Sequence, residues 1–256
     1  MQLLEFPHSH YCEKARWALD HKGIAYERVS IMPGLHVRRL KKIVPGTSVP
    51  VLLDGDTAIQ GSSSIIDYLD REFPESGLTP TDETEQKECR RLEEEFDLCF
   101  GVHLRRALYF HLLPHPAFVR HCFMSRSPWY ERWMFAAAYP FLRSRVAGVY
   151  GVHREEVEQG LTEMMRSLDH WDAILLPGKF LVGDRFSRAD LSLASMLYFA
   201  GLPTEFESPW PRETPTSAAE ALLQSLIDRP TIAWVESIYR SHRKLNRSDT
   251  GALIPL

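Results

Sequence analysis

Short apolar runs alternate with helical patterns over roughly the first eighty residues, which is typical of an α/β unit with a partly parallel sheet. One helical pattern buries Ala15, Ala18 and Leu19 and is followed by Gly23, a residue type that commonly ends helices. Further along, Asp54-Gly55 marks a tight turn between two strands. We therefore predict a βαβ unit, a short helix and a ββα unit around one four-stranded mixed sheet. The predicted strands are residues 3–6, 26–31, 49–56 with its turn, and 57–60; the predicted helices are residues 11–21, 37–42 and 62–73.

Beyond about residue 82 the apolar pattern is helical and predicts no strand. Residues 74–81 contain two prolines and a glycine and predict a linker. We therefore expect a first domain over residues 1–76 and an all-α second domain over residues 82–256. Four prolines within residues 202–216 predict an irregular segment. The predicted helices of the second domain are residues 82–110, followed by a proline break at 113–116, and then residues 129–150, 154–175, 188–201, 218–227 and 231–243.

The helix predicted at residue 188 has a clear start signal. Ser187 and Asp190 have the spacing of a capping box, with Asp190 in place of the more usual glutamate. A carboxylate that reaches back to the Ser187 N–H satisfies a backbone donor that would otherwise have no partner. We expect the change Asp190→Ala to cost about 1 kcal/mol or more of stability, so this pair has a structural role.

Composition narrows the class of protein. With 44% hydrophobic and 25% charged residues, the chain of 256 residues is typical of globular proteins with a sizeable core. A net charge of −4 gives no basic excess for nucleic acid, and no stretch has the length or start of a membrane span or signal peptide. The four cysteines have neither metal-ligand nor disulfide spacing, which indicates a reducing compartment. We expect a cytoplasmic protein with no metal, no nucleic-acid partner and no membrane association.

Five stretches, in this order along the chain, resemble soluble, cytosolic glutathione transferases, in particular bacterial-like members with a serine-type active site. They are residues 9–17, 45–52, 62–69, 187–190 and 229–230. The resemblance implies a thioredoxin-like glutathione-binding domain, an all-helical domain that holds the electrophile, glutathione as co-substrate, a role in detoxification and a homodimer.

Ser9 is the expected catalytic residue. It stands where a strand gives way to a helix, so backbone N–H groups and the positive end of the helix dipole meet in front of it. The resemblance implies that its hydroxyl donates to the glutathione sulfur and lowers the thiol pKa from about 8.5. The residue type also fits a helix N-cap, and the two roles can coexist. Cys12, one turn later, is interpreted as a structural thiol, with a mixed disulfide on Cys12 as the alternative.

The third strand and third helix supply the expected glutathione contacts. Val49-Pro50 resembles the cis-proline of the family, where the residue before the proline pairs with the cysteinyl part of glutathione. A trans proline opening an edge strand is the alternative. Ser62 opens the third helix and is expected to bind the γ-glutamyl carboxylate.

One position departs from the family pattern. Glutamate or glutamine usually precedes the helix-opening serine and holds the γ-glutamyl ammonium, and this chain has Gly61 there. The candidates on either side are Gln60 and Ser63, and the alternative is an acidic residue of the second domain or of a partner subunit. His36 is the first candidate for the glycyl carboxylate, within a basic segment that otherwise reads as a solvated face.

Aromatic residues around the proline break are candidates for the electrophile pocket, although aromatic residues at helical spacing also fit a plain core. They are Tyr109, Phe110, Trp129 and Trp133. The leading hypothesis is therefore an enzyme that transfers glutathione to a small apolar electrophile. The alternatives are a non-catalytic transferase-like binding or regulatory protein and a thiol transferase that uses Cys12.

Overall fold

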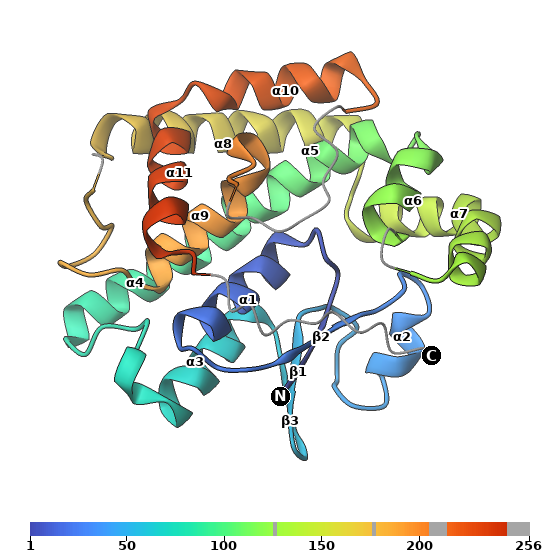
Figure 1. Ribbon diagram of the computed structural model, residues 1–256. Coiled ribbons are helices and arrows are strands. Elements are labelled where there is room, and N and C mark those ends of the chain that lie inside the picture. The colour runs from blue at the N-terminus through green and yellow to red at the C-terminus, as the bar shows by residue number, and fades with distance from the viewer. Residues whose placement is uncertain (125–126, 176–177, 205–213, 245–256) are drawn as a thin grey trace.

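The structure is a computed structural model of the chain, and it describes residues 1–124, 127–175, 178–204 and 214–244 (Figure 1). Its N-terminal part has the predicted order of strands and helices. The elements are β1 (Gln2–Glu5), α1 (His10–His21), β2 (Glu27–Ser30), α2 (His36–Leu40), β3 (Val51–Asp54), β4 (Thr57–Gln60), α3 (Ser62–Glu72) and the short 3₁₀ turn η1 (Pro74–Ser76).

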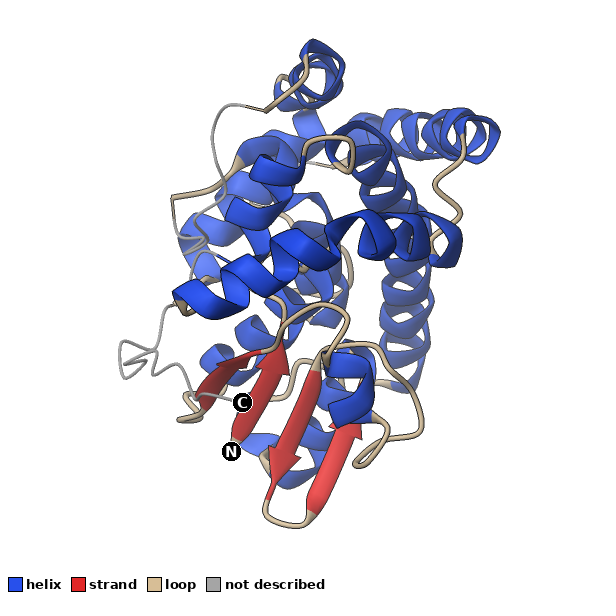
Figure 2. Ribbon diagram, turned by 90° about the vertical axis from the view of Figure 1, so that its right-hand side faces the viewer, coloured by secondary structure: helices blue, strands red, loops and turns tan. Residues whose placement is uncertain are grey.

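The four strands form one mixed sheet in the order β2-β1-β3-β4 (Figure 2). β1 pairs with β2 in parallel and with β3 antiparallel, and β3 pairs with β4 antiparallel. Because successive side chains of a strand point to opposite faces, Leu3 packs on the side of α1 and α3, whereas Leu4 packs with Leu40 of α2. The sheet therefore has helices on both faces, which confirms the fold class that the resemblance implies.

The described residues beyond η1 contain helices and no strand. In Figure 1 these helices lie above the sheet domain. They are α4 (Glu83–Phe96), the π-helical segment η2 (Asp97–Val102), α5 (His103–Leu112), α6 (Pro116–Met124), α7 (Trp129–Val149), α8 (Arg154–Ile174), α9 (Arg188–Gly201), α10 (Ser217–Ile227) and α11 (Pro230–His242). The irregular segment predicted over residues 202–216 falls mostly on residues 205–213, outside the described residues.

Two features of this domain differ from the sequence pattern. The helix predicted over residues 82–110 is interrupted by η2, a π segment that widens the helix locally. Gly101 lies in this segment, and a Cβ there would meet the Tyr11 hydroxyl oxygen at 2.6 Å, so the glycine permits close contact with α1. The pattern also does not predict α6, because Pro116 reads as a helix break although proline is favourable at the first position of a helix.

Helix α9 is the centre of the molecule, and residues 188–200 are all buried. It packs against α1, α4 and α11. The capping box is present: the Asp190 carboxylate accepts from the Ser187 N–H (2.8 Å), the Ser187 hydroxyl (2.7 Å) and the Leu181 N–H (2.8 Å). This helix therefore begins at a fixed residue and orients the elements that surround it.

A buried ion network joins the two parts of the chain. The Lys14 ammonium of α1 lies 2.7 Å from carboxylate oxygens of both Glu93 and Asp97. The Arg188 guanidinium of α9 lies 2.6 Å from Glu93 and 2.6 Å from Asp67 of α3. Because buried charges are costly unless they are paired, this network fixes α4 and η2 relative to the sheet domain.

The described residues also give findings on membrane-spanning helices and on the state of the cysteines. Within the described ranges, no helix is long and apolar enough to cross a bilayer. Cys12, Cys89, Cys99 and Cys122 are all free thiols.

Candidate functional site

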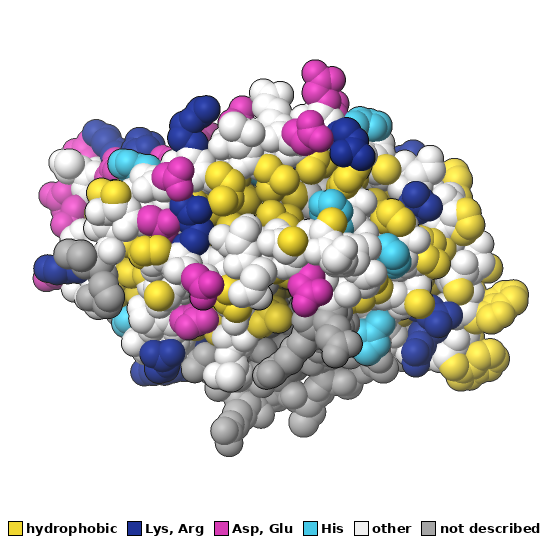
Figure 3. Space-filling model, turned by 90° about the horizontal axis from the view of Figure 1, so that it is seen from above, with side chains coloured by type: hydrophobic (Ala, Val, Ile, Leu, Met, Phe, Trp, Pro, Cys, Tyr) yellow, Lys and Arg dark blue, Asp and Glu magenta, His cyan; other side chains and the backbone are white. Residues whose placement is uncertain are grey.

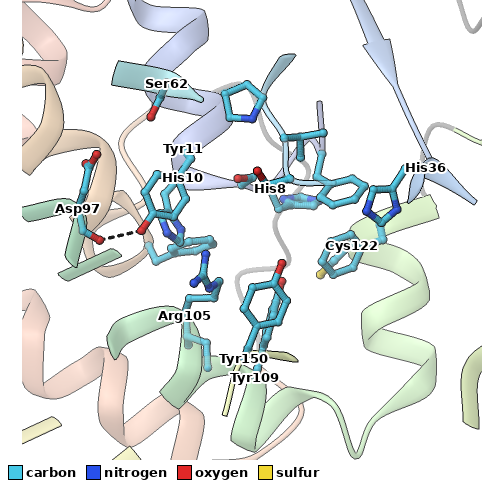
Figure 4. A pocket seen from close by; sticks show the side chains of 18 of the residues that line it. His8, His10, Tyr11, His36, Ser62, Asp97, Arg105, Tyr109, Cys122 and Tyr150 are labelled. Atoms are coloured by element: carbon cyan, nitrogen blue, oxygen red, sulfur yellow. Dashed lines mark hydrogen bonds between the residues drawn. The ribbon is translucent and has the colours of Figure 1, made fainter. Parts of the chain in front are cut away.

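A cavity of about 470 Å³ lies between the sheet domain and the helical domain. Its first wall is built from the start of α1, the segment before β3 and the start of α3, and its second wall from η2, α5, α6 and α9. Figure 4 shows Ser62 and His8 on one side and Arg105, Tyr109 and Tyr150 on the other. Residues that are far apart in the sequence thus face one space.

Ser9 lines this cavity as the N-cap of α1. Its backbone is extended (φ −80°, ψ 123°), and its Oγ accepts from the Cys12 N–H at 3.4 Å. The cap bond uses a lone pair of the oxygen, and the hydroxyl also has a side-chain hydrogen bond with the neutral Cys12 thiol. A thiolate in the cavity is a stronger acceptor than that thiol for the hydroxyl proton. Capping and donation to a sulfur are therefore compatible in this geometry.

The turn that carries Ser9 is held from both domains. The Ser9 N–H donates to the Phe6 carbonyl at 3.0 Å, and the Tyr198 hydroxyl of α9 donates to the His8 carbonyl at 2.9 Å. The Arg16 guanidinium donates to the Pro7 carbonyl at 3.2 Å. A hydroxyl on such a turn is positioned by the fold rather than by its own rotamer alone.

Cys12 is turned away from the cavity. Its side chain is 0% exposed, and burial raises the pKa of its thiol to about 12. A nearby Glu5 carboxylate adds to the rise, while Arg16 opposes it. The thiol therefore stays protonated at neutral pH, as expected of a structural cysteine.

The segment before β3 and the start of α3 lie together in the first wall. The Val49–Pro50 peptide bond is cis, as the resemblance implies, and both residues line the cavity. Ser62 is the first residue of α3 and lines the cavity with Gly61, whose φ of 97° favours glycine. The free N–H groups of this helix start form a site suited to a carboxylate.

Gln60 and Ser63, the two candidates near Gly61 for the γ-glutamyl ammonium, each have hydrogen-bond partners within the protein. The Gln60 amide accepts from the Gly46 N–H at 3.0 Å and donates to the Ser48 carbonyl at 2.8 Å, so it braces the loop before Val49. The Ser63 hydroxyl accepts from Lys14 at 3.2 Å and lies 3.4 Å from an Asp97 oxygen. Ser63 lines the cavity and Gln60 does not, and both belong to networks that hold the wall in shape.

His36 lies at the far end of the first wall, as Figure 4 shows. Its Nδ1 accepts from the Gly34 N–H at 2.9 Å, and its ring meets the Phe6 ring edge-on with centroids 5.0 Å apart. Burial lowers the pKa of His36. Backbone hydrogen bonds with Met32 and Thr47 oppose this fall in pKa, and the ring is mainly neutral near neutral pH.

Of the four aromatic candidates for the electrophile pocket, only Tyr109 lines the cavity. Tyr109 lines the cavity beside Tyr150, and their ring centroids are 5.5 Å apart. Phe110 lies outside the lining, under the Arg154 guanidinium. Trp129 and Trp133 on α7 are 80% and 70% exposed, so they belong to the outer surface. Figure 3 shows apolar side chains on the outside at the right-hand end of the molecule, where Figure 1 places α6 and α7.

Asp97 opens η2 and lines the cavity close to α3, and its sequence pattern does not mark it as a site residue. Its carbonyl accepts from the Tyr11 hydroxyl at 2.7 Å, the bond drawn in Figure 4. One carboxylate oxygen is bound by Lys14, and the other has no hydrogen-bond partner among the described residues. Burial raises the pKa of Asp97, and the Lys14 cation opposes this rise.

Arg105, which the sequence pattern does not single out, also lies in the cavity wall, together with His10 beside Ser9. The Arg105 guanidinium carbon lies 4.4 Å from the centre of the Tyr150 ring and 5.5 Å from that of Tyr11. Burial and the Arg105 cation hold the pKa of His10 well below its ordinary value, so its imidazole is neutral. A sequence signal exists for Arg105, which is four residues, about one helical turn, before Tyr109.

Comparison with known proteins gives two family matches. Residues 3–77 match the model of the glutathione S-transferase N-terminal domain, and residues 154–222 match that of the glutathione S-transferase C-terminal domain. Together the two matches cover more than half of the chain and follow the order of the two domains.

Individual relatives match the chain over shorter stretches. Glutathione S-transferase Z1 of Arabidopsis thaliana is 39% identical over 85 residues, 32% of this chain and 38% of the relative. A stringent starvation protein A homolog of Pasteurella multocida is 36% identical over 70 residues, 27% of this chain and 33% of the relative. The chain thus aligns with about a third of the length of these curated relatives.

A solved structure shows the same fold over nearly the whole chain. It is a glutathione S-transferase of Ceriporiopsis subvermispora in complex with glutathione, with a TM-score of 0.62, 18% identity and coverage of 96% of this chain and 99% of that one. The order of elements, the cavity between the domains and the two family matches agree. The chain belongs to the soluble glutathione S-transferase family.

Proposed function

We propose that the chain is a glutathione transferase that joins the glutathione sulfur to an electrophilic carbon of a small, mostly apolar molecule. The observation that carries this proposal is that Ser9, Val49, Pro50 and Ser62 line one cavity although they come from three separate segments. The thiolate forms the carbon–sulfur bond while the carbon releases its leaving group with the bonding electrons. The work of this chain is then to favour the thiolate and to hold the two reactants together.

Ser9 is proposed as the residue that favours the thiolate. Its hydroxyl proton has only the neutral Cys12 thiol as a competing acceptor among the described residues, and the start of α1 presents a positive dipole end to the same space. A hydrogen bond to the charged form of a thiol lowers its pKa. The capping bond to the Cys12 N–H fixes the direction of the oxygen without consuming the proton.

The start of α3 and Asp97 are proposed to hold the γ-glutamyl group. Ser62 and the N–H groups of α3 suit its carboxylate. Asp97 suits its ammonium, because its side chain is 16% exposed, it lines the cavity near Ser62 and one of its oxygens lacks a partner among the described residues. A second-domain carboxylate would thus replace the side chain that Gly61 lacks, and Gln60 would act indirectly through the loop before Val49.

The wall of the second domain is proposed to hold the electrophile. Leu108, Leu112 and Phe123 line it together with Tyr109, so most of its surface is apolar. Apolar surface of this kind binds small molecules by removing them from water.

A non-catalytic binding protein is the second candidate, and Gly61 is the observation that favours it. A chain without the usual acidic or amide side chain could keep the fold and lose affinity for glutathione. Chemistry on Cys12 is disfavoured by its full burial and by its pKa of about 12. A homodimer, a cytoplasmic location and the domain limits at residues 76 and 82 stay predictions.

Calorimetric titration of the purified chain with reduced glutathione tests this proposal. We expect binding by the wild type, and about tenfold or greater loss for Ser62→Ala and for Asp97→Asn, because each removes a partner of a charged group. Glu94→Gln removes an exposed carboxylate three residues from Asp97 and serves as the matched control with unchanged affinity. Absence of wild-type binding would refute the transferase and support the non-catalytic protein.

A further inference from the structure

Arg105 is a cation that lines the cavity and has no role in forming the glutathione thiolate as proposed above. It comes from α5 and lines the cavity on the second-domain side, where Figure 4 shows it between Tyr11 and Tyr150. Its Nε is buried and has no hydrogen-bond partner, and no carboxylate of the described residues pairs with it. The guanidinium has a side-chain hydrogen bond with Tyr11 and lies over the faces of the Tyr11 and Tyr150 rings, at 5.5 and 4.4 Å from their centres.

Arg105 as a whole is half-buried, and the buried cations among the described residues differ from it in their partners. Each of them has at least one carboxylate partner within 3 Å, and they are Lys14, Arg16, Arg28, Arg188 and Arg243. The buried Nε of Arg105 has lost its contact with water without gaining such a partner, and a tyrosine face offsets only part of that cost. Arg105 is therefore placed as a cation that gains stability when an anion enters the cavity.

The surroundings of Arg105 do not supply that anion. Asp97 is the one carboxylate among the described lining residues, and one of its oxygens is bound by Lys14 at 2.7 Å. His10 is neutral, and Leu108 and Leu112 make the neighbouring surface apolar. The second-domain wall thus presents one positive group in a mainly apolar setting.

Building on the proposed transfer of glutathione, we propose that the electrophile carries a carboxylate and that Arg105 binds it. Guanidinium and carboxylate match in geometry, and their charge-assisted hydrogen bonds are stronger than neutral ones. The apolar part of the same molecule would lie against Leu108 and Leu112, and its electrophilic carbon would point towards Ser9. Arg105 then sets which apolar electrophiles are accepted.

Product-like ligands test this inference without turnover. S-benzylglutathione and S-propylglutathione, each with and without a terminal carboxylate, are titrated into the full-length protein by calorimetry. We expect at least one carboxylate conjugate to bind the wild type about tenfold or more tightly than its neutral counterpart. In Arg105→Gln this preference should fall to near onefold, and in Arg105→Lys it should be partly retained. If neither carboxylate conjugate binds the wild type more tightly than its neutral counterpart, the inference is overturned.

The controls separate this inference from the proposed function. Arg106→Gln is the matched control, because the Arg106 guanidinium donates to the carbonyls of Tyr150 and Glu156 and does not line the cavity; the carboxylate preference should persist. Reduced glutathione should bind Arg105→Gln as it binds the wild type. Loss of that binding would assign Arg105 to a carboxylate of glutathione and overturn the inference alone. Failure of the wild type to bind glutathione and every conjugate would overturn the proposed function and the inference with it.

Discussion

The Ser9 hydroxyl caps α1 and is proposed to donate to the glutathione sulfur, and the chemistry of a hydroxyl allows both roles. Oγ accepts from the Cys12 N–H through a lone pair, so the cap does not use the hydroxyl proton, and the neutral Cys12 thiol is a weak acceptor for it. At position 12 the same helix turn buries a thiol completely. The residue types at these two positions could be assigned roles from the sequence, because a strand-to-helix turn fixes which side chain faces outward and which faces the core.

Cys12 should therefore resist modification in the folded protein. At about pH 8 its thiol, with a pKa of about 12, is almost entirely protonated, and it is also shielded from solvent. We expect iodoacetamide to modify the half-buried Cys99 first and to leave Cys12 unmodified, as read by peptide mass spectrometry. All four cysteines should react in denaturant, which is the control. Rapid modification of Cys12 under native conditions, or glutathione trapped on it, would favour the thiol transferase.

Other side chains could not be assigned from residue type. Asp97 and Arg105 look like ordinary members of a charged helix, and only the packing of η2 against α1 brings them to the cavity. For Trp129 and Trp133 the sequence is misleading in the opposite direction. Their size suggests a pocket, and the structure places them on the outer surface of α7. Helical spacing identifies a shared face but does not say what that face meets.

At the scale of elements, local signals predict most of the secondary structure. All four strands follow from short apolar runs and turn residues, and α9 begins where its capping box places it. The π segment η2 and helix α6 are missed for a physical reason. The first contains Gly101, whose lack of a Cβ permits a close approach to Tyr11 that the local sequence does not reveal, and the second begins with a proline that the pattern reads as a helix end.

The start of α9 should be sensitive to the loss of Asp190. Its carboxylate accepts from two backbone N–H groups and from the Ser187 hydroxyl, so Asp190→Ala leaves these donors without this partner. We expect a loss of about 1–3 kcal/mol in the free energy of unfolding, measured by urea titration. Asp184→Ala removes an exposed carboxylate in the preceding loop and should change stability by less than about 0.5 kcal/mol. Equal effects of the two changes would contradict the capping role.

At the scale of the whole molecule, the site exists because two domains are held in one arrangement. α9 packs on α1 and α4, and the ion network of Lys14, Glu93 and Arg188 crosses the boundary between them. The sequence predicts both domains and their order. It does not predict which helix of the second domain lies over Ser9, because that depends on how side chains pack across the boundary.

Removing one member of this network should destabilise the entire chain. Arg188→Met leaves the Glu93 carboxylate buried with one partner fewer and frees Asp67 from the same guanidinium. We expect a loss of about 3–5 kcal/mol in the free energy of unfolding. Arg91→Met removes an exposed arginine that pairs with Glu88 and Glu95, and it should cost less than about 1 kcal/mol. A similar small loss for both variants would show that the network does not hold the domains together.

The ionisation of bound glutathione tests the central claim most directly. The ultraviolet absorbance of the thiolate is followed across pH for glutathione bound to the wild type, to Ser9→Ala and to Ser9→Thr, which keeps the hydroxyl. We predict a thiol pKa at least about one unit below 8.5 on the wild type, a return towards 8.5 on Ser9→Ala, and a value between them on Ser9→Thr. Bound glutathione with the same thiol pKa on the wild type and on Ser9→Ala would contradict the assignment of Ser9 as the residue that favours the thiolate.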